Sequence, residues 1–261
     1  MIDTHCHIDC INDIDDIINS FDGIIITSGY DDISNKKVIE LADRYDKVYG
    51  TLGIHPEEAS NEYNMEIVTN NLDNPKIIGL GEIGLDYHYT KDNIDEQIKL
   101  FKKQLDIAQE HNLPVVVHSR DAIEDTYNIL SKYKLKGSIH CFSSSLEMAK
   151  KFINIGYKIG VGGVVTFKNG KKLREVVSGI DIKDILTETD SPYLSPEPNR
   201  GKENNPSNVY YVIKEISNIK GISIDEVKSI TMKNSEDVFD KMKGMSWYGW
   251  EKIKAFTCRC S

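Results

Sequence analysis

The stretch PVVVHSR, residues 114–120, joins a continuously apolar run to a histidine and an arginine. Strands buried on both faces have such runs, and they belong to parallel sheets that helices cover on both sides. In a parallel barrel, the functional side chains lie at the carboxyl ends of the strands. The stretch therefore predicts a buried parallel strand that ends on candidate site residues.

Short β-rich runs of this kind alternate with helix-like segments along the 261-residue chain. We expect strands at residues 2–5, 23–28, 48–54, 76–83, 114–118, 137–141, 158–161 and 185–188. We expect helices at residues 11–20, 35–45, 57–72, 94–111, 122–132, 146–155, 171–177, 206–219 and 223–243. Eight strand–helix repeats in about 250 residues indicate the α/β class and a single (β/α)8 TIM barrel, with its site at the carboxyl-terminal rim of the strands.

No Gly/Ser-rich linker or low-complexity tract divides the chain, so residues 1–244 are expected to form one barrel domain. Residues 245–261, MSWYGWEKIKAFTCRCS, hold both tryptophans and two of the five cysteines. This tail either packs across the barrel bottom or is an artificial extension, and we assign it no catalytic role.

Composition limits the partners of the chain. A net charge of −9, from 32 basic and 41 acidic residues, argues against a protein that coats nucleic acid through general basicity. A local basic rim around an acidic, metal-loaded pocket remains compatible with that charge. No apolar run approaches the ~18 residues of a membrane span, so no membrane partner is expected. Five cysteines without C-x-x-C spacing, and no signal-peptide pattern, favour a reduced cytoplasmic protein, and no obligate protein partner is evident.

Residues of metal-ligand type fall at the ends of five predicted strands. A single histidine there is more often a hydrogen-bonded structural residue, and a single carboxylate is often a helix cap. Structural hydrogen bonding or helix capping does not explain why six histidines and carboxylates fall at one rim. Alternation in an extended strand also sends two of the histidines, in the sequence H-x-H, to one face. The candidate metal ligands are His5, His7, Glu82, His118, His140 and Asp190.

Four imidazoles and two carboxylates exceed the three protein ligands that a catalytic zinc ion usually has. Two divalent ions about 3.5–4 Å apart, bridged by a carboxylate and a hydroxide, would use the whole set. Mixed nitrogen and oxygen ligands suit zinc, manganese or cobalt, and magnesium less well. Asp3 shares the face of His5 and His7 one step deeper and is expected to support these ligands by hydrogen bonding.

An ordered series of motifs runs through the chain: IDTHCHID at 2–9, GIHP at 53–56, GEIGLDY at 81–87, PVVVHSRDAIED at 114–125, HCFS at 140–143, ILTETDSPYL at 185–194 and PNRGKENNP at 198–206. In this series the chain resembles the TatD-family metal-dependent deoxyribonucleases, within the amidohydrolase-like TIM-barrel superfamily. The resemblance covers about the first 240 residues.

The resemblance implies a role for each candidate ligand. His5 and His7 would bind one metal with Asp190, Glu82 would bridge both metals, and His118 and His140 would bind the second. The implied activity is hydrolysis of DNA phosphodiester bonds, as a 3′→5′ exodeoxyribonuclease acting on single-stranded or frayed ends through a metal-bridging hydroxide. Glu82 and Asp190 are the expected catalytic residues. For Asp190 the alternatives are a ligand alone, or a ligand that also deprotonates the attacking water.

Five further residues are candidate substrate contacts, each with a structural alternative. A histidine on the rim could contact phosphate or serve as a structural imidazole. An arginine beyond strand five could contact phosphate or form an ion pair with a nearby carboxylate. The loop after strand eight, where barrels often bind phosphate, carries an arginine and a lysine. A tyrosine after strand four could stack on a base or simply pack. These candidates are His55, Arg120, Arg200, Lys202 and Tyr87.

Two other functions compete with the nuclease. One is a small-molecule amidohydrolase, lactonase or phosphotriesterase on the same binuclear centre, since one barrel rim supports many chemistries. The other is a non-catalytic metal-binding scaffold. The loop PEPNRGKENNP, residues 196–206, favours the nuclease, because its arginine and lysine suit a phosphodiester better than a lactone.

Overall fold

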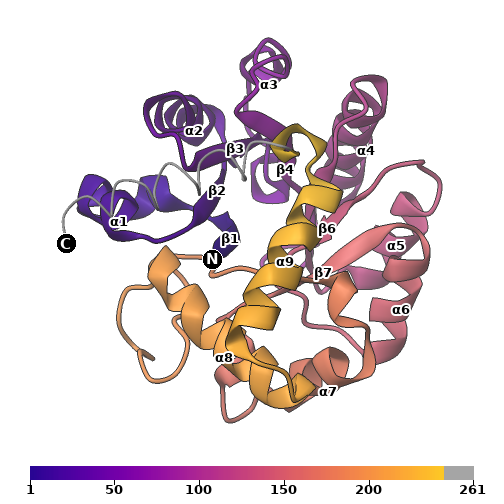
Figure 1. Cartoon of the computed structure of the whole chain (residues 1–261). Coiled ribbons are helices and arrows are strands. Elements are labelled where there is room, and N and C mark those ends of the chain that lie inside the picture. The colour runs from indigo at the N-terminus through magenta and orange to yellow at the C-terminus, as the bar shows by residue number, and fades with distance from the viewer. Residues whose placement is uncertain (244–261) are drawn as a thin grey trace.

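The computed structural model describes residues 1–243, so the predicted tail at 245–261 lies outside the described residues. Eight parallel strands follow one another around a single sheet in chain order, and helices surround them (Figure 1). The strands are β1 (Ile2–Cys6), β2 (Ile24–Ser28), β3 (Val48–Leu52), β4 (Ile77–Asp86), β5 (Val115–Arg120), β6 (Gly137–Ile139), β7 (Tyr157–Val161) and β8 (Ile185–Thr187). The predicted (β/α)8 TIM barrel is confirmed.

Side-chain hydroxyls help to join the last strand to the first. The Thr4 hydroxyl donates to the Thr187 carbonyl at 3.1 Å, and the Thr187 hydroxyl donates to the Ile2 carbonyl at 3.0 Å. Just beyond β8, the Asp190 N–H donates to the His5 carbonyl at 3.0 Å. Two of the chain segments that carry predicted metal ligands, the one with His5 and the one with Asp190, therefore meet at this seam.

The helices are α1 (Ile14–Ser20), α2 (Asp32–Arg44), α3 (Met65–Thr69), α4 (Ile94–Glu110), α5 (Ile123–Leu130), α6 (Leu146–Asn154), α7 (Lys171–Gly179), α8 (Val209–Lys220) and α9 (Ile224–Val238). The apolar stripe of α4 buries Phe101, Leu105 and Ala108, as its periodicity predicts. None of the helices within residues 1–243 is both long and apolar enough to cross a membrane.

The helix predicted over residues 57–72 is wrong. The structure has only a 3-10 helix at Pro56–Glu58 and the short α3 in that region. Asn64 has an extended backbone, its side chain accepts from the Glu66 N–H, and its own N–H donates to the Asp32 carboxylate. Because a side-chain cap fixes the start of a helix, α3 begins only after Asn64.

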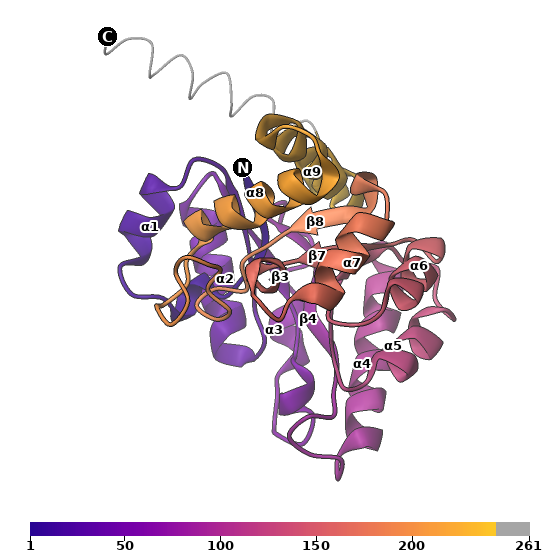
Figure 2. The same cartoon turned by 90° about the horizontal axis from the view of Figure 1, so that it is seen from below.

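An apolar plug closes the amino-terminal end of the barrel. Helix α9 lies across that end (Figures 1 and 2), and the residues after it pack among side chains from the first halves of the strands. This plug consists of Ile2, Ile24, Ile26, Tyr49, Ile78, Val116, Leu186, Val238, Phe239 and Met242. The polar side chains of the barrel are thereby left to its opposite, carboxyl-terminal end.

Replacing Phe239 with alanine is expected to lower the free energy of unfolding by about 3–5 kcal/mol, because it empties a fully buried position in the plug. Urea unfolding followed by circular dichroism measures the change. Ile33→Ala is the matched control, because Ile33 is 80% exposed and should give little change. Equal unfolding midpoints for Phe239→Ala and the unsubstituted chain would contradict the assignment of the plug.

Candidate metal centre

The six predicted metal ligands meet at the carboxyl-terminal rim of the barrel. His5 comes from β1, Glu82 from β4 and His118 from β5. His7 and His140 directly follow β1 and β6, and Asp190 lies three residues beyond β8. Ligand atoms of His5, His7 and Asp190 lie within 4.8 Å of one another, as do those of His5, Glu82 and His140. Residues up to 185 positions apart in the chain therefore form one cluster, as their places at strand ends predict.

The Glu82 carboxylate lies at the centre of this cluster. Its Oε2 atom is 3.4 Å from Nε2 of His5 and 3.2 Å from Nε2 of His7. Its Oε1 atom is 2.7 Å from both Nδ1 of His118 and Nε2 of His140. Each oxygen thus faces a different pair of imidazoles, which is the arrangement that a carboxylate needs to bridge two cations.

Asp190 lies beside the pair formed by His5 and His7. Its Oδ1 atom is 3.5 Å from Nε2 of His5 and 3.7 Å from Nε2 of His7. Its side chain is 14% exposed, whereas that of Glu82 is 4% exposed. Asp190 is therefore the carboxylate of the cluster that is more accessible from solvent.

Asp3 holds the segment that carries Asp190. Its carboxylate accepts from the backbone N–H of Thr189 at 2.9 Å and from the Thr189 hydroxyl at 2.5 Å. It also accepts from the backbone N–H of His5 at 3.4 Å. These bonds tie β1 to the chain after β8, and within residues 1–243 Asp3 makes no hydrogen bond to an imidazole ring.

Two imidazoles are oriented by Ser28 at the end of β2. The Nδ1 atom of His7 is 3.0 Å from the Ser28 carbonyl, which can only accept. This bond places the proton on Nδ1 and leaves the lone pair of Nε2 facing Glu82. The Nδ1 atom of His5 is 3.0 Å from the Ser28 hydroxyl, which in turn contacts the Thr51 hydroxyl at 2.8 Å.

Asp86 plays the corresponding part for His118. Its Oδ2 atom is 2.9 Å from Nε2 of His118, so the opposite nitrogen, Nδ1, faces Glu82. The sequence places Asp86 among residues that line the cleft, but it does not assign Asp86 or Ser28 a role in orienting these histidines. The signal was present for Asp86, because it lies an even number of residues from Glu82 in the same strand.

Glu188 is a further buried carboxylate that we did not identify from the sequence. Its Oε1 atom accepts from the Cys141 N–H, and its Oε2 atom has no hydrogen-bond partner in the described structure. Ligand atoms of Glu188, Cys141 and His140 lie within 4.8 Å of one another. Glu188 therefore lies against the cluster, on the side of His140.

The charges of the cluster are strongly coupled. Burial alone would raise the pKa of Glu82, but His140, His55 and His5 hold it well below its ordinary value. Burial likewise lowers the pKa of His118, yet its bonds to Asp86 and Glu82 raise it to about 9. Burial and the neighbouring His5 lower the pKa of His140 to about 4. An ionised carboxylate is thus surrounded by imidazoles that cannot all carry a second proton.

The atoms left without partners fit divalent cations. Nε2 of His5 is buried beside both carboxylates and makes no hydrogen bond within residues 1–243, whereas the unpaired buried atom of His140 is Nδ1, on the side of the ring away from Glu82. Nδ1 of His118 and Nε2 of His140 lie 3.2 Å apart, and both face the same oxygen of Glu82. Converging nitrogen lone pairs beside carboxylate oxygens form a donor set that suits zinc, manganese or cobalt.

His55 lies against the cluster with a different orientation. Its Nδ1 atom accepts from the Glu57 N–H at 3.3 Å, and its Nε2 atom is 3.5 Å from Oε1 of Glu82. A neutral His55 therefore carries its proton on Nε2 and directs a donor, rather than a lone pair, at the site.

The other predicted substrate contacts are distributed along the rim. The Arg120 guanidinium lies over the Tyr89 ring and makes no ion pair with Asp121, Glu124 or Asp125 in the described structure. Arg200 lies over the Phe167 ring at 3.8 Å, and Lys202 is exposed in the same loop. These residues remain candidates for phosphate contact.

The stacking of a base on Tyr87 does not agree with the structure. Its ring belongs to the buried core, and its hydroxyl donates to Asp125 at 3.0 Å. Because β4 continues to Asp86, the chain is still held against β5 at this point, where the Tyr87 N–H donates to the Arg120 carbonyl. Tyr87 packs within the barrel wall, which was the structural alternative.

Replacing Asp86 with asparagine is expected to weaken divalent metal binding about 10- to 100-fold, because His118 loses the carboxylate that orients it. Titration with Zn²⁺ or Mn²⁺ against a competing chelator measures the affinity. Asp121→Asn is the matched control, since Asp121 contacts the exposed His88 at 3.0 Å. Equal losses in the two variants would contradict the role of Asp86.

Metal binding is expected to release protons at about pH 8, because the pKa of His118 without metal is about 9 and a ligand must be deprotonated. The metal affinity should accordingly fall as the pH is lowered from about 9 to about 6. Calorimetric titration in two buffers of different ionisation enthalpy measures the release. Identical binding enthalpies in both buffers would contradict this prediction.

Comparison with known proteins agrees with the fold and with the cluster. A family model described as TatD related DNase matches residues 2–240. The chain is 36% identical over 251 residues to an uncharacterized metal-dependent hydrolase, YabD, of Bacillus subtilis, covering 92% of this chain and 98% of that protein. It is likewise 36% identical over 249 residues to a metal-dependent hydrolase of Methanocaldococcus jannaschii, covering 92% and 97% of the two chains.

Comparison with solved structures also supports the barrel fold. The TatD homologue YJJV of Escherichia coli K12 superimposes with a TM-score of 0.86 at 29% identity, covering 92% of this chain and 98% of that one. An organophosphorus hydrolase of Deinococcus radiodurans superimposes with a TM-score of 0.60 at 11% identity, covering 91% and 92% of the two chains, a likeness of fold alone. The chain belongs to the TatD related DNase family of metal-dependent hydrolases.

Proposed function

We propose that this chain hydrolyses the phosphodiester bonds of DNA with two divalent cations, as a 3′→5′ exodeoxyribonuclease on single-stranded or frayed ends. The main observation in support is the Glu82 carboxylate, whose two oxygens face two separate pairs of imidazoles. Membership of a family described as related to DNases adds to it.

The residues divide into two ligand groups in this proposal. His5, His7 and Asp190 would hold one cation, His118 and His140 would hold the other, and Glu82 would contact both. When bound, two such cations lower the pKa of water and stabilise negative charge on the phosphate. The hydrogen bonds to Ser28 and Asp86 keep the ring nitrogens of the histidines directed at the cluster.

Asp190 is proposed to orient the attacking water and to accept its proton, in addition to its role as a ligand. Burial alone would raise the pKa of Asp190, but its bond with His5 and the charge of nearby histidines hold it below the ordinary value. Its carboxylate is therefore ionised at neutral pH. Its greater exposure, compared with that of Glu82, lets a water reach it from the open end of the barrel.

Cationic side chains at the rim support a phosphodiester substrate. Arg200 and Lys202 lie in the loop after β8, and Arg120 ends β5. His55 directs an N–H toward the cluster and would donate to a phosphate oxygen when the substrate is bound. An uncharged lactone or amide has no use for these groups. The alternative, a small-molecule hydrolase on the same centre, draws only on the fold shared with the organophosphorus hydrolase.

Turnover of end-labelled DNA tests the proposal directly. Single- and double-stranded oligonucleotides are offered to metal-free protein to which zinc, manganese, cobalt or magnesium is restored, beside a panel of esters, lactones, amides and phosphotriesters. We expect stepwise release of nucleotides from the 3′ end, faster on single strands. Turnover confined to the small-molecule panel would favour the alternative.

Replacing Glu82 with glutamine is expected to lower kcat on DNA by a factor on the order of 10³, because the amide keeps the shape but removes the negative charge shared by the two groups. Gel analysis of labelled oligonucleotides gives the rate, and circular dichroism checks the fold. Glu40→Gln, on an exposed face of α2, is the control and should keep full activity. Digestion by Glu82→Gln at the unsubstituted rate would exclude the proposed centre.

A further inference from the structure

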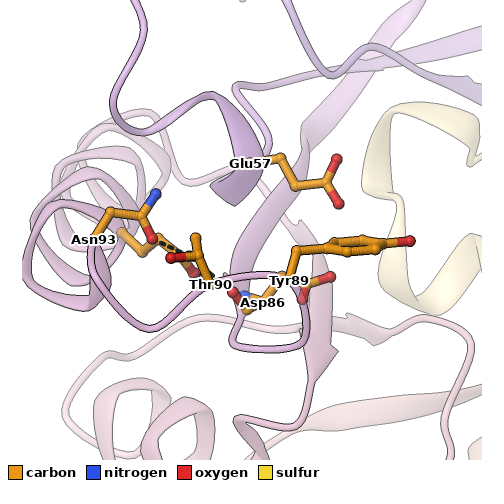
Figure 3. Close-up of a pocket in the computed structure, with 6 residues that line it drawn as sticks. Glu57, Asp86, Tyr89, Thr90 and Asn93 are labelled. Atoms are coloured by element: carbon orange, nitrogen blue, oxygen red, sulfur yellow. Dashed lines mark hydrogen bonds between the residues drawn. The ribbon is translucent and has the colours of Figure 1, made fainter.

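A hollow of about 380 Å³ opens on the rim directly beside the metal centre. It is lined by Glu57, Asp86, Tyr89, Thr90, Asn93 and Gln97 (Figure 3). Asp86 is the residue whose carboxylate contacts His118, so the hollow and the centre share a wall. The volume lies within the range of about 300–1,000 Å³ that is usual for small-ligand sites.

Hydrogen bonds of its own side chains hold the chain around the hollow. The Gln97 amide accepts from the Asp86 N–H at 2.8 Å and donates to the Asp86 carbonyl at 2.8 Å. It also donates to the Asn93 side chain at 3.0 Å, and Asn93 donates to Ser60 at 3.1 Å. Because these amides are already paired, the free surface of the hollow consists chiefly of Tyr89 and the Glu57 carboxylate.

Tyr89 is an aromatic residue that the fold does not bury. It lies in the segment between β4 and α4 and is 70% exposed, and its ring extends along one side of the hollow (Figure 3). The Arg120 guanidinium lies 5.0 Å from the ring centroid, and its Nη1 donates to the tyrosine hydroxyl at 3.3 Å. Arg120 does not line the hollow, so it holds the ring in place without filling the space in front of it.

The charge of the hollow discriminates between the parts of a nucleotide. Its lining carries two carboxylates, those of Glu57 and Asp86, and within the described part of the chain neither Lys nor Arg. A phosphate would be repelled there, whereas a flat, uncharged ring that bears amino groups can stack on Tyr89 and donate to a carboxylate.

We propose that Tyr89 is a stacking platform for a nucleobase of the substrate, and that the hollow beside it receives that base while the adjoining phosphodiester lies at the metal centre. The inference rests on the proposed function, because it takes DNA as the substrate. A base reaches the platform only when it is unpaired, so the same site gives a physical reason for a preference for single-stranded ends.

The experiment measures binding and turnover separately. Affinity is measured by fluorescence anisotropy with the metal-loaded protein and a labelled single-stranded oligonucleotide whose phosphorothioate linkages resist cleavage. Turnover is measured on an ordinary oligonucleotide and on one whose 3′-terminal residues are abasic, which offers phosphodiesters without a ring to stack. Tyr89→Ala should bind the oligonucleotide about 10- to 100-fold more weakly and cleave the abasic 3′ end at the unsubstituted rate. Tyr89→Phe, which keeps the ring, should bind within about 2-fold of the unsubstituted chain.

Tyr45→Ala is the matched control. The Arg44 guanidinium lies 5.0 Å from the Tyr45 ring centroid, the same distance as that of Arg120 from the Tyr89 ring. Tyr45 precedes the start of β3, so it lies at the opposite end of the barrel, and its loss should leave oligonucleotide affinity unchanged. An oligonucleotide with abasic sites at its 3′ end should bind equally to the unsubstituted chain and to Tyr89→Ala.

The outcomes separate this inference from the proposed function. Undiminished affinity of Tyr89→Ala for the oligonucleotide would overturn the platform even if the protein digests DNA. Binding that depends on Tyr89, without release of nucleotides, would keep the platform and remove the nuclease. An unsubstituted chain that neither binds nor cleaves the oligonucleotide would overturn both.

Discussion

The carboxylate of Glu82 is the contact on which the arrangement of the site depends. It extends from β4, yet it faces His5 on β1, and these strands are not neighbours in the sheet. Only a sheet that curls into a barrel brings them together, because the two side chains then meet across its mouth. The hydroxyl bonds between Thr4 and Thr187 therefore have a functional consequence, since they help to close the barrel where Asp190 must join His5.

The barrel divides stability and chemistry between its two ends. At the amino-terminal end, Phe239 and Met242 complete an apolar plug from which water is excluded. At the other end, Nε2 of His5 and Nδ1 of His140 are buried without hydrogen-bond partners in the described structure. An unsatisfied buried polar atom destabilises a fold by about 1–3 kcal/mol. The plug offsets that loss and lets the chain keep a cluster of closely spaced imidazoles and carboxylates.

Much of this could be predicted from the sequence, because apolar runs that end on polar residues identify both the strands and the rim. The six candidate ligands are predicted from their places at strand ends, and the structure brings them together. The supporting residues were harder. The role of Asp86 beside His118 is not evident from the sequence, because the predicted strand ends three residues before β4 does. Beyond that end Tyr87 is buried, whereas Tyr89 is exposed. The helix predicted over 57–72 was wrong because Asn64 caps a shorter one, a preference of local hydrogen bonding that apolar spacing does not reveal.

The proposed bridging of two cations by the Glu82 carboxylate is open to direct measurement. Electron paramagnetic resonance of the protein titrated with Mn²⁺ measures both the number of ions and their separation. Two Mn²⁺ ions bridged at about 3.5–4 Å should give an exchange-coupled spectrum at saturation, with two ions bound per chain. A six-line spectrum of isolated Mn²⁺ at saturation, with one ion per chain, would contradict the account.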